Sequence, residues 1–146
     1  MSVPSTTEYR EMSTLMAEKS PPRVLVVDDE SLIRWSLAEV LSDSGFLVDE
    51  AGDGATAVNL LSDGRPFDVV LLDYRLPDSN DLHLLEAIRR VSPGSTIIMM
   101  TAFGTPEMVD GALKMGASRV VPKPFDVHDM ARLVAEVAEA GPPHIA

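Results

Sequence analysis

Short apolar runs alternate with stretches of helical periodicity along most of this chain. The first run, residues 24–27, and a later one, residues 69–72, consist only of Val and Leu. A run that is apolar at every position is typical of a strand buried on both faces of a parallel sheet. Between such runs, apolar residues recur at intervals of three or four, as on one face of an amphipathic helix. The sequence therefore predicts strands that alternate with helices.

Five such units can be delimited. Thr105 and Asp126 are expected N-caps of the last two helices, with Pro106 in a first turn, and Gly45 is expected just past the end of the first helix. Alternating strands and helices imply an α/β fold, a doubly wound parallel sheet with right-handed crossovers and helices on both faces. The expected strands are residues 24–27, 46–51, 69–72, 96–100 and 120–121, and the expected helices are residues 31–44, 55–63, 81–91, 106–115 and 127–140.

The two ends of the chain differ in composition from the part between them. Residues 1–22 are rich in Ser, Thr and Pro, which predicts a flexible N-terminal arm. Residues 23–141 contain all five units and are expected to form one domain. Residues 142–146 follow Gly141 and begin with two prolines, so we expect a C-terminal tail or the start of a linker to a further domain.

Composition excludes several classes of function. The chain has no Cys, which excludes disulfides, thiolate zinc sites and cysteine nucleophiles. Its formal net charge of −11 favours no binding to nucleic acid. No apolar run approaches the ~20 residues of a membrane helix, and the first 20 residues lack the apolar centre of a signal peptide. We therefore expect a cytoplasmic protein without nucleic-acid or membrane partners.

Acidic and polar residues stand where the predicted strands end. In open parallel sheets, functional groups gather at the carboxyl ends of the strands. Asp28 and Asp29 follow the first strand, Asp73 the third, Thr101 the fourth and Lys123 the fifth. Each pair of carboxylates at ~4 Å would cost about 4 kcal/mol near a protein surface, and a divalent cation reverses that sign. An oxygen-only set of ligands favours Mg2+ over zinc.

The same cluster suits the transfer of a phosphoryl group. Lys123 and Thr101 can neutralise and bond phosphoryl oxygens while a carboxylate attacks in line. Taken alone, Asp28 and Asp29 would be helix caps, Asp73 a turn residue and Lys123 a solvated charge. Their joint occurrence at the correct strand ends of a regularly alternating chain favours the functional interpretation.

Residues 24–29, 69–77, 100–102 and 121–125 together resemble the receiver domain of response regulators in two-component systems. The resemblance implies a flavodoxin/CheY-like (βα)5 three-layer sandwich and a phosphoryl group placed on Asp73 by a cognate sensor histidine kinase. It also implies a cis peptide before Pro124. For the ligands and the chemistry it implies Mg2+ bound by Asp29, Asp73 and the backbone carbonyl of Arg75, with Asp28 acting through water, and Thr101 and Lys123 on the phosphoryl oxygens.

Within that family, residues 101–107 look most like receivers of the NtrC type, which precede a sigma-54-dependent transcription activator. Two departures stand out. Asn80-Asp81-Leu82 replaces the usual Asp-Gly-Leu, so the tight turn that glycine permits must be built otherwise. Val120 occupies the usual position of a switch Tyr or Phe. We therefore expect Thr101 and Phe103, rather than Val120, to carry the switch.

Several functions fit these residues. The favoured one is a phosphoacceptor signalling domain that is not an enzyme in the ordinary sense and that forms a phosphorylation-dependent homodimer. A pseudo-receiver that only docks a partner is an alternative. A haloacid-dehalogenase-like phosphatase would need a second Asp where Glu30 stands, and a flavodoxin-like flavin carrier would need a phosphate-cradling loop where Asp28 begins an acidic run.

Overall fold

A computed structural model describes residues 3, 5–10 and 20–141 of the chain. Residues 6–10, within the expected N-terminal arm, are helical. The rest of that arm, apart from residues 3, 5 and 20–22, lies outside the described residues, and so does the expected tail at residues 142–146. In the part of the chain that is described, no helix has the length and apolarity needed to cross a bilayer.

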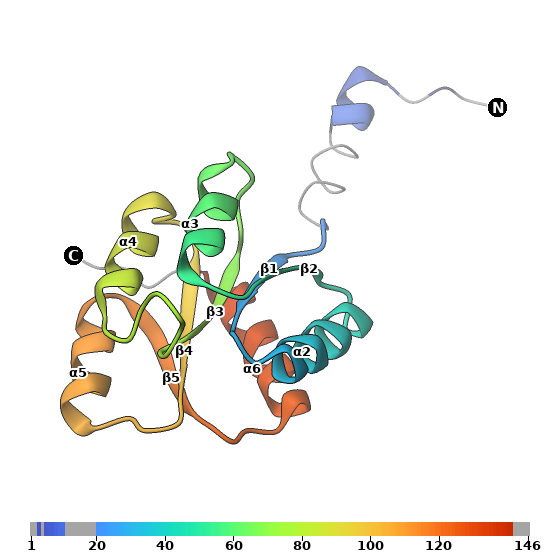
Figure 1. The fold of residues 1–146 in the computed structure, drawn as a ribbon. Helices are drawn as coiled ribbons and strands as arrows, with labels where there is room; N and C mark the ends of the chain where they lie inside the picture. The colour runs from blue at the N-terminus through green and yellow to red at the C-terminus, as the bar shows by residue number, and fades with distance from the viewer. Residues whose placement is uncertain (1–2, 4, 11–19, 142–146) are drawn as a thin grey trace.

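Residues 23–140 form a three-layer sandwich around one parallel sheet (Figure 1). The strands lie in the order β2-β1-β3-β4-β5, and every neighbouring pair is parallel. This confirms the doubly wound (βα)5 fold. The elements are β1 (Arg23–Val27), α2 (Ser31–Asp43), β2 (Leu47–Ala51), α3 (Gly54–Ser62), β3 (Val69–Asp73), α4 (His83–Val91), β4 (Thr96–Thr101), α5 (Pro106–Lys114), β5 (Ala117–Pro122) and α6 (Val127–Ala140).

Alternate side chains of each central strand pack into two separate hydrophobic cores, one on each face of the sheet. Val24 and Val26 of β1 point to the side of α2 and α6, whereas Leu25 and Val27 point to the side of α3, α4 and α5. Strands β3 and β4 divide their side chains in the same way. Both faces of these strands are therefore covered by helices, which explains why their sequences are apolar without alternation.

Two elements differ from the expected bounds by more than one residue at an end. Strand β5 is longer than expected because it begins at Ala117 and includes Ser118 and Arg119. It is an edge strand that pairs only with β4, so polar residues are tolerated there and interrupt the apolar run. Helix α4 begins at His83 rather than near Asp81, because the Asp81 carboxylate accepts a hydrogen bond from the His83 backbone N–H instead of joining the helix.

The expected helix caps are present. The Thr105 hydroxyl accepts from the Met108 N–H, and the Asp126 carboxylate accepts from the N–H groups of His128 and Asp129. Gly45 has a φ of 96°, as expected of a residue just past a helix end. These caps fix where α5 and α6 begin, and therefore the lengths of the loops that leave β4 and β5.

Candidate functional site

The carboxyl ends of β1 and β3 bring three acidic side chains together. Asp28 is fully buried directly after β1, Asp29 beside it is exposed, and Asp73 ends β3 with 6% of its surface exposed. One carboxylate oxygen from each can be chosen so that all three lie within 4.8 Å of one another. Oxygen-only ligands at this spacing fit a hard divalent cation such as Mg2+. The structure therefore supports the predicted acidic cluster.

Lys123 reaches this cluster from the loop that follows β5. Its Nζ lies 2.8 Å from Asp28, 3.3 Å from Asp73 and 3.5 Å from Glu30, and its side chain is only 9% exposed. Its backbone N–H donates to the Thr101 carbonyl oxygen at 2.8 Å, which ties the loop to the end of β4. The peptide bond between Lys123 and Pro124 is cis, as the resemblance implied.

The surroundings of Asp73 disfavour its charge. Burial, and then the neighbouring Asp28 carboxylate, raise the pKa of Asp73 from 3.8 to about 6, against the opposing effect of Lys123. The Arg75 backbone N–H also donates to this carboxylate and lowers its pKa in part. A carboxylate held this way gains more than an ordinary one from any added positive charge.

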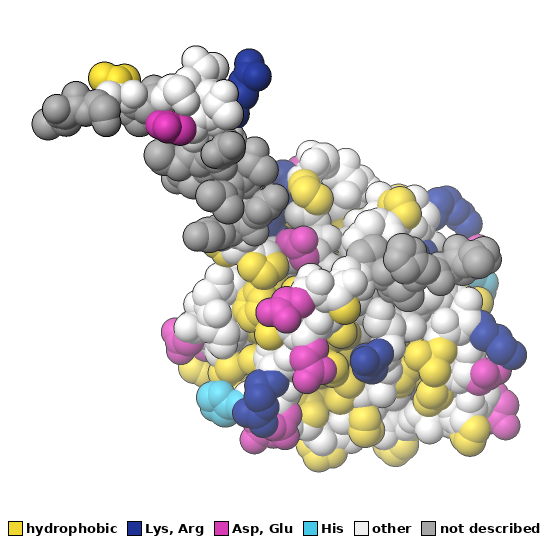
Figure 2. All heavy atoms as spheres, turned by 180° about the vertical axis from the view of Figure 1, so that it is seen from behind, with side chains coloured by type: hydrophobic (Ala, Val, Ile, Leu, Met, Phe, Trp, Pro, Cys, Tyr) yellow, Lys and Arg dark blue, Asp and Glu magenta, His cyan; other side chains and the backbone are white. Residues whose placement is uncertain are grey.

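The charge of Lys123 is secured by the same neighbours. Burial alone would lower the pKa of its ammonium group, but the hydrogen bond to Asp28 and the charges of Asp28 and Asp73 outweigh burial and raise it. One ammonium group therefore stands among the carboxylates of Asp28, Asp29, Glu30 and Asp73. The crowding is local, because on the face in Figure 2 acidic and basic side chains are interspersed with apolar ones.

Thr101 and Arg75 complete the surroundings of Asp73. Thr101 is buried at the end of β4, and its hydroxyl accepts from the Phe103 N–H at 3.2 Å. The Arg75 guanidinium lies 5.6 Å from the centroid of the Phe103 ring, within range of a cation–π contact. Phe103 itself is 72% exposed. The predicted hydroxyl and the predicted switch residue are thus joined through the backbone at the edge of the site.

Arg34 is a supporting residue that the sequence did not reveal. Its guanidinium donates to the Asp28 carbonyl oxygen at 2.6 Å and to the Glu50 carboxylate at 3.2 Å. The Asp28 carboxylate meanwhile accepts from the Glu30 N–H at 2.9 Å. These contacts fix the turn that carries Asp28 and Asp29. The only signal in the sequence was a basic residue on the first turns of a helix, which is ordinary for a solvated surface.

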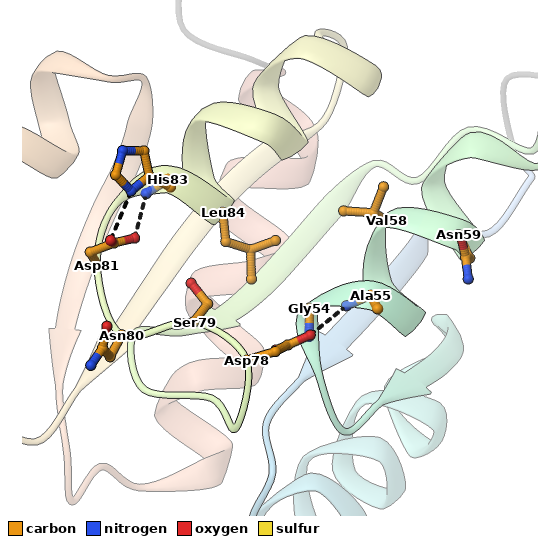
Figure 3. Close-up of a pocket in the computed structure, with 10 residues that line it drawn as sticks. All are labelled: Gly54, Ala55, Val58, Asn59, Asp78, Ser79, Asn80, Asp81, His83 and Leu84. Carbon is orange, nitrogen blue, oxygen red and sulfur yellow. Dashed lines mark hydrogen bonds and ion pairs between the residues drawn. The ribbon is translucent and has the colours of Figure 1, made fainter.

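A second missed residue holds the loop that follows β3. Asp78 lines a groove of about 610 Å³ and points to the start of α3, where its two carboxylate oxygens accept from the N–H groups of Gly54 and Ala55 at 2.8 and 3.0 Å (Figure 3). Leu76 and Ser79 exchange two backbone hydrogen bonds in the same loop, at 2.7 and 3.2 Å. Sequence alone indicated only a turn at these positions.

The turn without glycine is built from Asp81. Its carboxylate accepts from the His83 N–H at 2.9 Å and pairs with the His83 ring at 2.7 Å (Figure 3). These bonds lower the pKa of Asp81, and the side-chain bond raises that of His83. Among the described residues, no residue other than glycine has a positive φ. The loop therefore avoids the backbone conformation that a glycine would have allowed.

Comparison with known proteins agrees with this geometry. The family model described as "Response regulator receiver domain" matches residues 24–135. The chain belongs to this family. The matched range contains the acidic cluster, Thr101 and Lys123, so the site described above is the phosphoacceptor pocket of a signalling module.

Individual relatives vary in their length and output. The transcriptional regulatory protein PdtaR of Mycobacterium tuberculosis is 40% identical over 113 residues, which are 75% of this chain and 53% of that protein. The DNA-binding transcriptional regulator NtrC of Escherichia coli is 37% identical over 111 residues, 76% of this chain and 24% of that protein. The chain thus spans about half the length of PdtaR and about a quarter of NtrC.

Among solved structures, the beryllofluoride-activated NtrC4 receiver domain dimer is 32% identical, with a TM-score of 0.75 over 81% of this chain and 97% of that one. The similarity extends over nearly the whole of that receiver. It agrees with the fold observed here.

Proposed function

We propose that Asp73 accepts a phosphoryl group from a cognate sensor histidine kinase and that the resulting change controls transcription. The observation that carries this proposal is the position of Asp73, buried at a strand end beside Asp28 and 3.3 Å from the Lys123 ammonium. An Asp73 carboxylate oxygen attacks phosphorus, the bond between phosphorus and the kinase histidine breaks, and that histidine keeps the bonding electron pair. The product is an acyl phosphate on Asp73.

Asp28, Asp29, Asp73 and the backbone carbonyl of Arg75 are the groups that we assign to a Mg2+ ion. When bound, the ion supplies positive charge that offsets the repulsion among the carboxylates and the charge on the phosphoryl oxygens. The chain's own cation, Lys123, contributes a point charge to one phosphoryl oxygen and remains paired with Asp28. Thr101 donates its hydroxyl proton to another phosphoryl oxygen. The Thr101 Oγ1 accepts from the Phe103 N–H, and a hydroxyl that accepts one hydrogen bond can still donate its own proton.

The direct test is phosphoryl uptake from acetyl phosphate with Mg2+, followed by intact-mass spectrometry. We expect one added phosphoryl group that hydroxylamine removes, none in Asp73→Asn and none with EDTA. Asp68→Asn is the matched control, because Asp68 directly precedes the same strand at its opposite end and its variant should be labelled normally. Equal uptake by Asp73→Asn would reject the assignment, and uptake by neither the wild type nor the control would favour a pseudo-receiver.

A groove beside Lys123 supports the approach of a protein partner. It has a volume of about 430 Å³ and lies between α2 and the loops that follow β4 and β5. Leu32 on its rim is a large apolar residue left exposed. Lys123, which lines this groove, lies 3.3 Å from Asp73, so a partner seated on this rim would be close to the acceptor. The groove is lined by Glu30, Leu32, Ile33, Ser36, Ala102, Lys123, Pro124, Phe125 and Val127.

We assign residues 23–141 to the receiver unit, residues 1–22 to an N-terminal arm and residues 142–146 to a tail or linker. The parent protein that we propose is a cytoplasmic NtrC-type regulator with a sigma-54-dependent activator domain. Its support is the run from Thr101 to Glu107 and the similarity to NtrC and to the NtrC4 receiver. Sequencing the reading frame after Ala146 tests this, because a different output domain there would reject the subclass.

Phosphorylation is proposed to act through association of two receivers by α5, β5 and α6. Leu113 and Met115, at and after the end of α5, are large apolar residues that remain exposed. The NtrC4 receiver to which the chain is similar is itself described as a beryllofluoride-activated dimer. Sedimentation velocity with and without beryllofluoride should show a shift from monomer to dimer. An unchanged monomer in both states would reject dimerisation as the response.

We further propose that Phe103 transmits the state of Asp73 to α5, in place of an aromatic residue at Val120. Val120 is half-buried against the core of α3, α4 and α5, and its β-branched side chain has few χ1 rotamers, so it cannot swing as an aromatic ring could. Gly104 sits close to Thr101, since a Cβ there would lie 3.1 Å from the Thr101 methyl group. Any movement of Thr101 toward a phosphoryl oxygen therefore moves this loop, and Phe103 with it.

A further inference from the structure

The groups assigned to the cation come from two loops that are far apart in sequence. Asp28 and Asp29 lie on the loop after β1, and the Arg75 carbonyl lies on the loop after β3. A cation can bind tightly only if the two loops are already at the right separation, because ordering a mobile loop on binding costs free energy. Whatever holds the loops together sets part of the metal affinity.

Asp78 joins the second loop to the first turn of α3. Its two carboxylate oxygens accept from Gly54 N at 2.8 Å and from Ala55 N at 3.0 Å, and Asp53 accepts from Thr56 N at 2.7 Å. Three N–H groups that no helical carbonyl can satisfy are thus satisfied by two carboxylates. The Asp78 bonds are also favoured by the positive end of the helix dipole. They are the stronger, charge-assisted kind of hydrogen bond.

The contact between the loop and α3 is close. A Cβ built on Gly54 would lie 3.2 Å from the Asp78 Oδ1 atom and 2.9 Å from a terminal methyl group of Leu84. Gly54 is buried, so a side chain there would push the carboxylate away from the helix. The glycine therefore permits the approach that the two hydrogen bonds require.

The start of α3 is in turn attached to the loop that carries Asp28. The Asp28 N–H donates to the Ala51 carbonyl oxygen at 3.0 Å, and Arg34 donates to the Asp28 carbonyl oxygen at 2.6 Å. Arg34 also packs against Gly52, where a Cβ would lie 3.3 Å from its guanidinium. Residues 51–54 thus lie between the two metal-binding loops and contact both of them.

We propose that Asp78 is a positioning residue that sets the affinity of the site for Mg2+. It presets the loop of the Arg75 carbonyl by fixing that loop to α3, and through residues 51–54 to the loop of Asp28 and Asp29. This inference rests on the proposed function, since it takes these groups to be the cation's ligands. Asp78 is not one of the groups assigned to the cation or to the phosphoryl oxygens, and it acts through the hydrogen bonds of its carboxylate to the N–H groups of Gly54 and Ala55.

The test compares Mg2+ titrations of acetyl phosphate uptake in full-length wild type and variants. In Asp78→Ala the half-saturating Mg2+ concentration should rise by about tenfold, as is common when an outer partner of a metal ligand is removed. The maximal rate at saturating Mg2+ should stay near that of wild type, because excess cation orders the loop. Asp78→Asn keeps one acceptor oxygen and should lie between the two.

Asp81→Ala is the matched control, because it removes another exposed carboxylate of the same loop whose bonds reach only His83. Its half-saturating Mg2+ concentration should stay at the wild-type value. A merely structural role of Asp78 would lower stability in urea without this separation of half-saturation from maximal rate. An unchanged half-saturation in Asp78→Ala, or an equal rise in Asp81→Ala, would overturn the proposal.

Two further measurements keep the test decisive. If Asp78→Ala does not fold, Asp78→Asn and Gly54→Ala replace it; a raised half-saturation in both supports the proposal, and wild-type values overturn it. Calorimetric titration with Mg2+ alone separates the positioning role of Asp78 from the proposed phosphoacceptor function. If wild type takes up no phosphoryl group but binds Mg2+ more tightly than Asp78→Ala does, the proposed function fails and the positioning role stands.

Discussion

At the amino ends of the strands the acidic groups are matched by donors, whereas at the carboxyl ends they crowd around one ammonium group. Before β3, the Asp68 carboxylate accepts from the Arg23 N–H at 2.7 Å. The Arg23 guanidinium pairs with Asp49 at 3.0 Å and lies 4.4 Å from the centroid of the Phe67 ring. Ser95, fully buried nearby, donates to the Phe67 carbonyl oxygen at 2.7 Å. Each of these polar groups therefore has a partner in the folded chain.

At the carboxyl ends of the same strands, acidic groups outnumber the positive groups that could pair with them. Asp28 and Asp73 share Lys123, and the pKa of Asp73 stands at about 6 because burial and Asp28 oppose its charge. An acid pair placed there for stability alone would be a poor choice. The difference indicates that the amino ends hold the sheet together, while the carboxyl ends keep a carboxylate ready to gain from a cation and a phosphoryl group.

The largest expected effect is on stability when the charge of Asp73 is removed. Its pKa of about 6 in the folded chain, against 3.8, corresponds to at most about 3 kcal/mol of destabilisation by the ionised form. Asp73→Asn should therefore raise the free energy of unfolding at pH 7 without divalent ions. The folded state binds the extra proton between pH ~4 and ~6, so the difference should be absent below that window and complete above it.

Urea unfolding of both proteins at pH 4, 5, 6 and 7 measures this. Asp68→Asn is the comparison variant, and it should lose stability because Asp68 bonds the Arg23 N–H. A gain in the free energy of unfolding for Asp73→Asn and a loss for Asp68→Asn would support the difference between the two ends of the sheet. Destabilisation by both would show that the carboxyl end is held together by its charges as the amino end is.

The second effect is the response to Mg2+. A cation present at 100 times its dissociation constant should stabilise wild type by about 2.7 kcal/mol, because it binds the folded state only. Thermal unfolding with increasing MgCl2 should show this gain in wild type and in Asp68→Asn. Asp73→Asn should gain less, having lost one charged ligand. An equal gain in all three proteins would place the bound Mg2+ away from the carboxyl ends of the strands.

The third prediction concerns the amino end alone. Ser95→Ala should cost about 2 kcal/mol, because it leaves the buried Phe67 carbonyl oxygen without the Ser95 donor and removes the 2.6 Å contact with the Ser92 hydroxyl. Phosphoryl uptake should not change. Ser62→Ala, on an exposed position of α3, is the control and should stay within ~0.5 kcal/mol of wild type. Chemical denaturation measures the free energy of unfolding of both variants. An unchanged value for Ser95→Ala would show that this hydrogen bond at the amino end does not stabilise the sheet.

The smallest stability effect should come from Phe103→Ala. The ring is exposed and its contact with Arg75 is worth under ~1 kcal/mol at such a site. Phosphoryl uptake should persist, but the amide NMR shifts that beryllofluoride induces along α5 should be lost. Val120→Ala should keep those shifts. The reverse pattern would show that the signal runs through Val120 despite its missing ring.

The sequence was sufficient for the layers of the fold and for most of the cluster. Apolar runs such as residues 69–72 are legible because burial on both faces leaves no polar position. Asp28, Asp73 and Lys123 could be grouped because strand ends of a parallel sheet meet at one edge. The bounds of β5 could not be read in the same way, since Arg119 lies on an edge strand where one side faces solvent.

The supporting residues were beyond the reach of the sequence for a different reason. Asp78 has its partners 23 and 24 residues away, and Arg34 bonds a backbone oxygen and a carboxylate on two other elements. Neither contact leaves a periodic pattern or a motif. Asp81 was recognised as a departure from glycine, but its bonds to His83 appear only once the loop is folded.

The parallel ladder does not stop where the strands do. Tyr74 N donates to the Met100 carbonyl oxygen at 2.9 Å, and Lys123 N donates to the Thr101 carbonyl oxygen at 2.8 Å. Backbone hydrogen bonds therefore join the segments that carry Asp73, Thr101 and Lys123 into one rigid frame. Residues 102–104 leave this hydrogen-bonded frame at Thr101 and lead into α5. A change at Asp73 that shifts Thr101 should displace this loop, whereas the hydrogen-bonded strands stay in place. Movement should therefore reach α5 while α2 and α6, on the other face, keep their places.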